Sequence, residues 1–155
     1  MRAQILELLR SRTPEPVSGE EISSKLGVSR TAIWKHIQTL KNLGYEIESV
    51  PKKGYILRSA PDLLSPEEIV THLHTEWVGH HIHYMKTTNS TNEVGKKLAA
   101  DGCADGMTVV AEEQTSGKGR LARGWFSPYG RGVWVSVVLK PPFLPEEAPK
   151  CTFMA

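Results

Sequence analysis

Two helix-start signals on either side of one glycine constrain the first third of the chain more than any other feature. Ser18 and Glu21 have the spacing of a capping box, in which the serine hydroxyl accepts from the Glu21 amide and the Glu21 carboxylate reaches back to the Ser18 amide. Gly27 follows where a left-handed residue would end this first helix. Ser29 is a second N-cap, and apolar residues at helical spacing follow it as far as Gly44. The segment is therefore predicted to form a helix-turn-helix.

A further helix precedes this pair, and a hairpin follows it. Residues 5–10 have the apolar spacing of a short amphipathic helix that ends before Pro14. Residues 45–57 alternate like two half-buried strands around a Pro-Lys-Lys-Gly turn. Three short helices and a basic hairpin in this order predict a winged helix-turn-helix DNA-binding domain over residues 1–60.

The net charge of the chain is +2, which is too small to indicate a nucleic-acid partner by itself. The basic side chains, however, gather on the two elements that would face DNA, where Arg and Lys contact phosphates or guanine. An all-helical interaction module with a solvated basic face is the alternative, but the order of caps, glycine turn, basic helix and basic hairpin favours DNA binding. The candidate DNA-binding residues are Ser29, Arg30, Thr31, Trp34 and Lys35 in the second helix of the motif and Lys52 and Lys53 in the hairpin turn.

Length and composition limit the rest of the prediction. With 155 residues, 39% hydrophobic and 23% charged, the chain has room for one ordinary globular domain, or for one small domain and part of another. Cys103 and Cys151 form no disulfide framework, which suits a reducing compartment. The first residues do not resemble a signal peptide, and the longest apolar stretch, residues 133–139, is far too short to span a bilayer. We expect a soluble, cytoplasmic protein.

A second domain is expected after a short linker at residues 61–65. Ser65, Pro66 and Glu68 have the pattern of an N-cap, a first-turn proline and a capping-box acid. The patterns that follow predict a strand at 80–85, a helix at 93–100, and buried strands at 107–111 and 133–140. Residues 66–155 are therefore predicted to form part of a second domain that contains both helices and strands.

A long glycine-rich and basic loop, residues 112–132, separates the last two predicted strands. Glycines let a backbone approach a ligand closely and present amides to an anion. The loop predicts a flexible flap over a phosphate-bearing ligand, and a mobile surface loop with solvated charges is the alternative. Its central residues are Gly117, Lys118, Gly119, Arg120 and Arg123.

Three better-known phosphate-binding motifs do not fit this loop. Its glycines match the first part of a dinucleotide fingerprint, but no helix opens after them and no acidic residue follows at a distance of about 20 residues. No Gly-Lys pair is followed by Ser or Thr, which excludes a P-loop. The third glycine and the Val-Ala-x-Lys segment of a kinase loop are also lacking.

Several histidines lie close together between residues 72 and 83. His81 and His83 would share one face of a strand, but no carboxylate or cysteine accompanies them at the spacing of a known zinc motif. We expect structural or surface histidines and no metal site. Trp34 and Trp77, each taken alone, are expected to be packing residues.

Taken together, these motifs resemble those of the bifunctional biotin–protein ligases that are also biotin operon repressors. The ligase half is indicated by Ser90-Thr91-Asn92, Glu113-Gln114, Gly117-Lys118-Gly119-Arg120 and Trp125-Phe126-Ser127-Pro128. The repressor half is indicated by Ser18-Gly19-Glu20, Lys35-His36-Ile37 and Val50-Pro51-Lys52-Lys53-Gly54-Tyr55. The resemblance covers nearly the whole chain. It implies an α+β fold, with an N-terminal winged helix-turn-helix followed by the N-terminal part of a class II synthetase-like α/β mixed-sheet domain.

The resemblance implies a ligase and a transcriptional repressor in one protein. Such ligases make biotinyl-5'-adenylate from biotin and ATP with Mg2+, and then transfer biotin to a lysine of a biotin carboxyl carrier protein. In the bifunctional members the adenylate also promotes a homodimer, which binds operator DNA. The expected ligands are therefore biotin and the ATP–Mg2+ complex, with no metal bound by the protein itself and no membrane partner.

The resemblance also implies roles for residues of the second domain. Neutral donors and acceptors suit the ureido ring, and cations suit the biotin carboxylate and the adenylate phosphate. The implied catalytic residues are Lys118 and Arg120. The implied biotin-binding residues are Ser90, Thr91, Asn92, Gln114, Lys118, Gly119 and Arg120. The implied adenylate flap adds Gly117, Arg123 and Trp125, with the Trp125 ring near the adenine.

The chain departs from the family pattern in two places. The family usually has Arg where this chain has Lys118, and a lysine keeps the charge but loses the bidentate fork. It usually has Gly where this chain has Ala122, a change that would stiffen the flap. We expect weaker retention of the adenylate rather than loss of activity.

The chain ends at Ala155, before a Lys-Trp-Pro-Asn-Asp segment that supplies an essential lysine in the family and before a small β-barrel-like domain. We therefore expect this polypeptide alone to be a poor ligase. One alternative is a DNA-binding regulator whose ligase half is catalytically incompetent. Another is a nonfunctional fragment whose exposed half-sheet associates nonspecifically.

Overall fold

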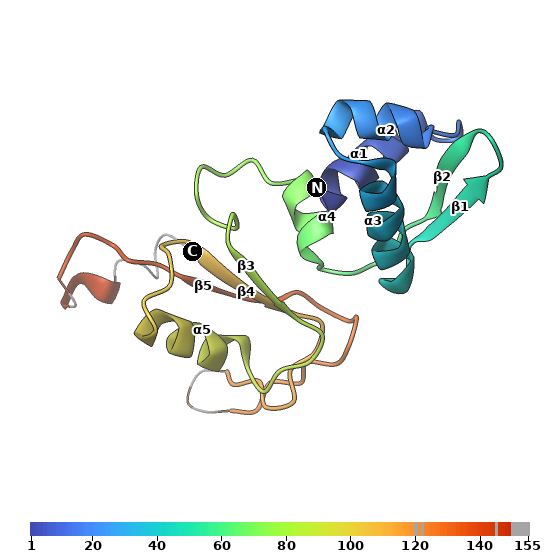
Figure 1. Ribbon diagram of the computed structural model, residues 1–155. Coiled ribbons are helices and arrows are strands. Elements are labelled where there is room, and N and C mark those ends of the chain that lie inside the picture. Colours follow the sequence, from blue (N-terminus) through green and yellow to red (C-terminus); the bar gives the residue numbers. More distant parts are fainter. Residues whose placement is uncertain (120, 122, 145, 150–155) are drawn as a thin grey trace.

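The computed structural model describes residues 1–119, 121, 123–144 and 146–149. It has two parts that meet at a short central helix (Figure 1). One part contains three helices and a hairpin, and the other contains a three-stranded sheet with a helix on one face. In the described part of the chain, no helix has the length and apolar character needed to cross a membrane.

The first part is a winged helix, as predicted. Its helices are α1 (Arg2–Arg12), α2 (Gly19–Leu26) and α3 (Arg30–Asn42), and its antiparallel hairpin joins β1 (Glu46–Val50) to β2 (Gly54–Ser59). The hydroxyls of Ser18 and Ser29 accept from the amides of Glu21 and Ala32 at 3.0 and 3.2 Å, so each serine caps its helix. Gly27 ends α2 in the left-handed conformation, with φ of 65°. The local start and stop signals therefore give the helix boundaries correctly.

The second half of the predicted capping box is wrong. The Glu21 carboxylate contacts the cations of Arg12 and Lys25, at 3.1 and 3.2 Å, instead of reaching back to the Ser18 amide. The hydrogen bonds from these two cations lower the pKa of Glu21. The carboxylate thereby links α2 to the end of α1, a contact that the spacing of the capping box does not contain.

The winged-helix core is formed by one apolar face from each helix together with the inner faces of the hairpin. Its fully buried members include Ile5, Leu6, Leu9, Ile22, Ile33, Ile37 and Leu40. The hairpin is also tied to the loop before α2, because Val17 and Tyr55 exchange two backbone hydrogen bonds of 2.9 Å. The wing is therefore held to the helices by backbone pairing as well as by side-chain packing.

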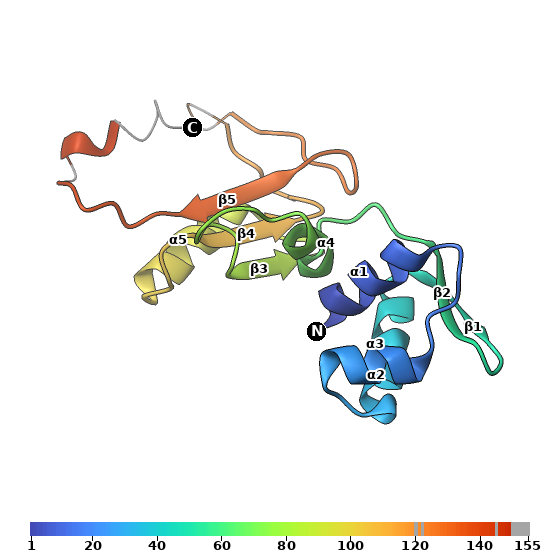
Figure 2. The same ribbon diagram turned by 90° about the horizontal axis from the view of Figure 1, so that it is seen from above.

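The second part contains α4 (Pro66–Thr71), α5 (Thr91–Ala100) and a sheet of order β3–β4–β5. Its strands are β3 (Ile82–Met85), β4 (Met107–Ala111) and β5 (Trp134–Val138). Strand β4 is parallel to β3 and antiparallel to β5, so the predicted mixed sheet is confirmed. Helix α5 covers one face of β4 and β5 (Figure 2). Each element lies within a few residues of its predicted range.

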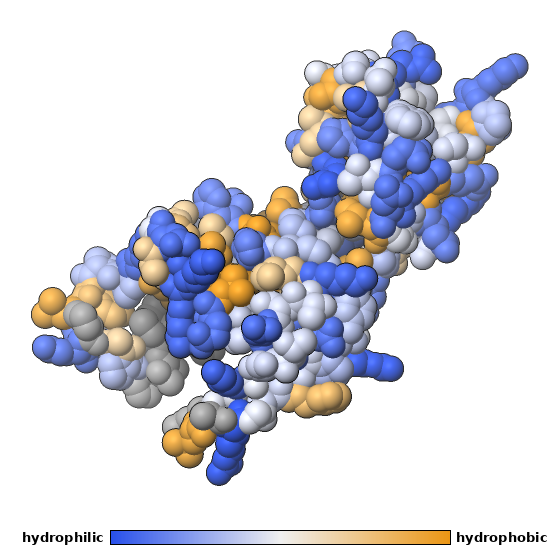
Figure 3. Space-filling view, turned by 60° about the horizontal axis from the view of Figure 1, so that its bottom comes forward, coloured by the Kyte–Doolittle hydropathy of each residue, from blue (hydrophilic) through white to orange (hydrophobic). Residues whose placement is uncertain are grey.

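The other face of β5 is apolar and open to solvent. Val133, Val135, Val137 and Leu139 alternate along and beside this strand and are all exposed. Apolar patches interrupt the hydrophilic surface over the sheet part (Figure 3). β5 is at one edge of the described sheet. An apolar edge strand favours association with other polypeptide segments.

Helix α4 packs against α1 of the winged helix. The Arg10 guanidinium donates to both oxygens of the Glu68 carboxylate at 2.6 and 2.7 Å, and the Tyr45 hydroxyl donates to Glu68 Oε1 at 2.5 Å. Burial, reinforced by the hydrogen bond to Glu68, raises the pKa of Tyr45 to about 12. The N-cap hydroxyl of Ser65 also accepts from the Glu68 amide. The predicted division at residues 61–65 stays a prediction, and the helix that follows it contacts the preceding domain.

The linker also contacts the sheet through a buried carboxylate. Glu112, 2% exposed, follows β4 and accepts from the Leu64 amide at 2.8 Å and from the Tyr84 hydroxyl at 2.9 Å. Burial, followed by the hydrogen bond to Glu112, raises the pKa of Tyr84. Glu68 thus ties α4 to the winged helix, and Glu112 ties the linker to the sheet.

Candidate functional site

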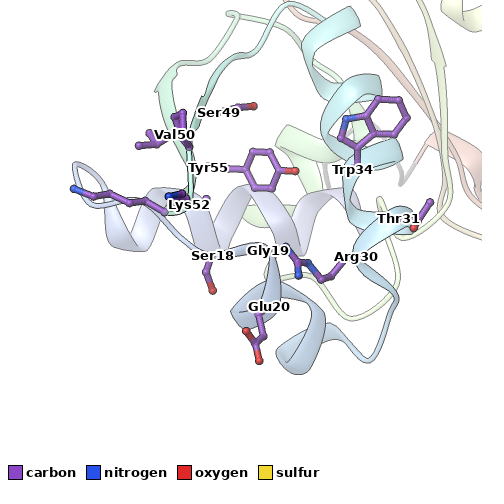
Figure 4. Close-up of a pocket in the computed structure, with 13 residues that line it drawn as sticks. Ser18, Gly19, Glu20, Arg30, Thr31, Trp34, Ser49, Val50, Lys52 and Tyr55 are labelled. Atoms are coloured by element: carbon purple, nitrogen blue, oxygen red, sulfur yellow. The ribbon is translucent and has the colours of Figure 1, made fainter.

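A groove of about 700 Å³ lies between the N-termini of α2 and α3 and the wing. Figure 4 shows Trp34 and Tyr55 projecting into it from α3 and β2, with Arg30 beside Gly19. Of the predicted DNA-binding residues, Arg30, Thr31, Trp34, Lys52 and Lys53 line the groove. The structure thus brings the basic residues of the helix and of the wing to one concave surface.

Two predicted DNA-binding residues lie outside the lining of this groove. Lys35 is exposed on α3 next to Trp34, so it extends the basic surface along the helix. The Ser29 hydroxyl caps α3 by accepting from the Ala32 amide. Ser29 is exposed, and its hydroxyl proton can still be donated to a partner such as a phosphate oxygen.

The groove has a further aromatic residue that the sequence patterns did not single out. Tyr55 was expected only as part of the return strand, but its ring lines the groove together with Trp34. Its neighbour Gly54 has φ of 122°, and Lys52 at the turn has φ of 62°. The glycine that ends the Pro-Lys-Lys-Gly turn is the sequence signal for this left-handed turn, which directs the start of β2 and hence Tyr55. Aromatic side chains among cations are common in nucleic-acid interfaces.

Trp34 and Trp77 were both expected to be packing residues, and the structure agrees with this for Trp77 only. Trp34 is 53% exposed and lines the groove, so the expectation is wrong for this residue. Trp77 is 51% exposed, but its ring lies so close to Gly106 that a Cβ there would come within 2.6 Å of Trp77 Cδ1. Trp77 therefore packs on one side only.

A second cluster of polar side chains surrounds Gln114. Its Oε1 accepts from the Thr91 amide at 2.8 Å and from the Thr91 hydroxyl at 3.1 Å, and its Nε2 donates to Ser127 Oγ at 3.1 Å. The Ser127 hydroxyl, 2% exposed, donates in turn to the Trp125 carbonyl at 3.2 Å. Thr91 Oγ1 also lies 2.8 Å from Ser136 Oγ. The side chain of Gln114 is thus held between the start of α5 and the loop, and Ser136 of β5 joins the cluster through Thr91.

Ser90 differs from the other helix-capping serines. Ser18, Ser29 and Ser65 each cap a helix through the hydroxyl, whereas the Ser90 hydroxyl makes no such bond to the described amides of α5. Ser90 is nevertheless buried, and it lies next to Thr91 at the start of the helix. The hydroxyl that would usually cap α5 is therefore free of that role.

The glycine-rich loop is more regular than predicted. Trp125 N donates to Gly117 O and Gly119 N donates to Arg123 O, both at 2.8 Å, and Gln114 N donates to Ser127 O at 3.0 Å. Residues 114–119 and 123–127 therefore pair like a distorted hairpin, where an irregular segment was expected. The glycines make this pairing possible because they let the two backbones approach closely. Arg120 and Ala122 lie outside the described residues.

The predicted ligand-binding residues are only partly brought together. Thr91 and Gln114 are bonded directly, and the backbone of Gly117 lies beside Gln114. The Trp125 ring, 59% exposed, lies against Gly119, where a Cβ would be 3.4 Å from it. Three further predicted residues are exposed to solvent, which are Asn92, Lys118 and Arg123.

Two serines of this cluster were not assigned a role from the sequence. Ser127 belongs to the quoted Trp-Phe-Ser-Pro motif, which marked it without indicating its partner. Ser136 is the one polar residue in β5, and this interruption of an apolar strand is the signal that could have found it. Both hydroxyls bind neighbours of Gln114 or Gln114 itself.

Comparison with known proteins assigns both parts of the chain. Residues 2–56 match the HTH domain family, and residues 84–152 match the Biotin/lipoate A/B protein ligase family. The Bifunctional ligase/repressor BirA of Bacillus spizizenii is 41% identical over 155 residues, which are 100% of this chain and 48% of that protein. The protein of the same name from Bacillus subtilis is 42% identical over the same shares of the two chains.

Among solved structures, part of the chain is similar to the biotin protein ligase from Aquifex aeolicus in complex with biotin and ATP. The identity is 33% and the TM-score is 0.33, over 39% of this chain and 24% of that chain. The chain spans about half the length of the curated relatives it matches. The chain is thus similar along its whole length to bifunctional ligase/repressor proteins, with a match to the HTH domain family followed by a match to the Biotin/lipoate A/B protein ligase family.

Proposed function

We propose that this chain binds operator DNA through its winged helix and biotin through the cluster around Gln114. In the whole protein these sites would serve a ligase that makes biotinyl-5'-adenylate from biotin and the ATP–Mg2+ complex and transfers biotin to a carrier lysine. The names of the relatives, which combine ligase and repressor, support this combination. The proposed domains are residues 1–60 for DNA, 61–65 as linker, and 66–155 for biotin and adenylate.

The observation that carries the ligand proposal is the fixed amide of Gln114. Its carbonyl oxygen is fully engaged by Thr91, and one N–H is engaged by Ser127. Among the described residues no acceptor takes the second N–H of Gln114, which remains for a ligand, and the buried Ser90 hydroxyl does not cap α5. A preoriented neutral donor suits the oxygen of the neutral ureido ring, since a buried unpaired ureido group costs free energy.

The glycine-rich loop would close over the other end of biotin. In the proposed reaction a carboxylate oxygen of biotin forms a bond to the α-phosphorus of ATP, and the bond to the pyrophosphate leaving group breaks. Because two anions approach each other, fixed positive charge lowers the barrier. Lys118 of the described loop would supply such charge, and Arg120 is proposed for the same role by family resemblance. The exposed Trp125 ring offers a surface on which adenine could stack.

A calorimetric titration with biotin tests the ligand proposal. We expect saturable binding by the chain, and about 10- to 100-fold weaker binding by Gln114→Ala, because that change removes one hydrogen bond to the ligand and the groups that orient it. Lys97→Ala is the matched control, since Lys97 is exposed on the same helix α5. If a folded wild-type chain binds no biotin, the ligand proposal fails and the DNA-binding regulator becomes the better description.

The DNA proposal is tested by the salt dependence of binding to a duplex. Arg30→Ala and Lys35→Ala are each expected to weaken binding, and to reduce the slope of log affinity against log salt by about 1 for each lost phosphate contact. Fluorescence anisotropy with a labelled duplex measures both quantities, and Lys97→Ala again serves as the control. Unchanged slopes in both variants would show that DNA does not contact α3.

In the whole protein, we propose a homodimer when adenylate is bound and a biotin carboxyl carrier protein as the acceptor of biotin. Both proposals rest on the family alone. Sedimentation of the full-length protein with and without biotinyl-adenylate would test the first of them. An unchanged sedimentation coefficient at micromolar protein concentration would contradict a ligand-linked dimer.

A further inference from the structure

The side chains around Gln114 form a chain of hydrogen bonds whose direction is fixed. A backbone N–H can only donate, so the Gln114 side-chain atom that faces the Thr91 amide at 2.8 Å must be the carbonyl oxygen. The same oxygen lies 3.1 Å from the Thr91 hydroxyl, which must therefore donate its single proton to Gln114. The amide orientation of Gln114 and the proton of Thr91 are thus both determined.

The direction of these hydrogen bonds also determines which atom donates between Thr91 and Ser136. Thr91 Oγ1 and Ser136 Oγ are 2.8 Å apart, and either atom taken alone could be the donor. Since the Thr91 proton is committed to Gln114, Ser136 must donate to Thr91. The single hydroxyl proton of Ser136 is then used, and its remaining lone pairs can only accept.

The position of Ser136 places this acceptor inside the cluster. It lies opposite Val109 in the antiparallel pair of β4 and β5 and faces α5, where a Cβ on Gly95 would be 3.8 Å from the Ser136 Cβ. Its flanking residues Val135 and Val137 point to the other face of the sheet. An acceptor-only hydroxyl among apolar strand residues suits a ligand N–H.

We propose that Ser136 determines specificity in the biotin site by accepting a hydrogen bond from a ureido N–H. The proposal rests on the proposed function of the Gln114 cluster. A cyclic urea has two N–H donors beside one carbonyl acceptor. The free N–H of Gln114 would donate to that carbonyl and the lone pair of Ser136 would accept from one N–H, so the protein presents the complementary pattern.

A cycle of two variants and two ligands tests the proposal. The ligands are biotin and its cyclic carbonate analogue, in which oxygen replaces both ureido N–H groups. Ser136→Ala is expected to weaken biotin binding about tenfold and to change the affinity for the analogue less than about twofold. Ser136→Cys, a similar-sized side chain with a weak acceptor, gives the same readout if Ser136→Ala does not fold.

Each other outcome overturns the assignment. Equal weakening of both ligands by Ser136→Ala would show that Ser136 acts only by supporting Thr91. No weakening of either ligand, or equal affinities of the wild-type chain for biotin and the analogue, would show that no N–H is recognised at Ser136, while the proposed biotin site would stand. Failure of the wild-type chain to bind either ligand would instead overturn the proposed function, and the role of Ser136 with it.

Discussion

Replacing Gly54 by alanine is expected to destabilise the winged helix by about 3–5 kcal/mol. A Cβ at this position would come within 2.0 Å of Val17 O and 2.6 Å of the Ser18 Cα, and both are backbone atoms that cannot rotate away. The φ of 122° adds strain for any residue with a side chain. The two backbone bonds between Val17 and Tyr55 would be lost as the wing moves away. Urea unfolding followed by circular dichroism measures the change.

Gly27→Ala is the control that separates steric overlap from backbone strain. Gly27 also has a positive φ, 65°, but no described heavy atom lies within 4 Å of its built Cβ. We expect a cost of only about 1–2 kcal/mol for this variant. Duplex binding should survive in Gly27→Ala and be lost in Gly54→Ala, because only the second change displaces the wing that carries Lys52. Similar unfolding midpoints for the two variants would show that the Val17 contact does not hold the wing.

The local features of the winged helix could be predicted from the sequence, but the contact of the wing with Val17 could not. The caps at Ser18 and Ser29 and the stop at Gly27 are local, since each depends on atoms within one helical turn, and all three were predicted correctly. The pairing of Val17 with Tyr55 joins residues far apart in the sequence, and no local pattern indicates which edge of the hairpin is used. The glycine at position 54 was predicted as turn chemistry, and its close approach to another segment appears only in the structure.

The partners of the acidic residues in the two capping boxes also could not be predicted from local spacing. Glu21 and Glu68 were both expected to bond back to their N-cap serines. Glu21 instead contacts Arg12, and Glu68 contacts Arg10. A carboxylate that pairs with an arginine gains the attraction of a full positive charge in addition to charge-assisted hydrogen bonds, so a cation from another segment displaces the local amide as partner. Sequence spacing identifies the helix start correctly but not the partner of the carboxylate.

The ligand site was predicted through motifs rather than through contacts. Those motifs name Thr91 and Gln114, and the structure joins the two side chains. The sequence did not predict a role for Ser136, because that role depends on the register of β5 against β4. A shift of one residue would turn the Ser136 side chain to the other face of the sheet. Register of this kind is set by tertiary packing, which the alternation of one short strand does not specify.

Replacing Gly117 by alanine is expected to weaken biotin binding by about 100-fold or more. A Cβ there would lie 2.8 Å from both Ser127 Oγ and Trp125 O, and 3.2 Å from Gln114 Nε2. The methyl group would therefore push apart the atoms that hold the Gln114 amide, and would weaken the bond from Trp125 N to Gly117 O. Calorimetry with biotin measures the loss, and the unfolding midpoint shows that the variant still folds.

Gly124→Ala tests whether the loop needs flexibility or close approach. Gly124 lies in the same hairpin, opposite Lys118, but no described heavy atom lies within 4 Å of its built Cβ. If close approach at Gly117 matters, Gly124→Ala should bind biotin within about fivefold of the wild-type chain, because replacing glycine at a position without steric overlap changes the free energy by less than about 1 kcal/mol. Equal losses in the two variants would contradict this account. They would mean that the loop works through its freedom to move, and that the hydrogen bonds around Gln114 follow ligand binding rather than prepare for it.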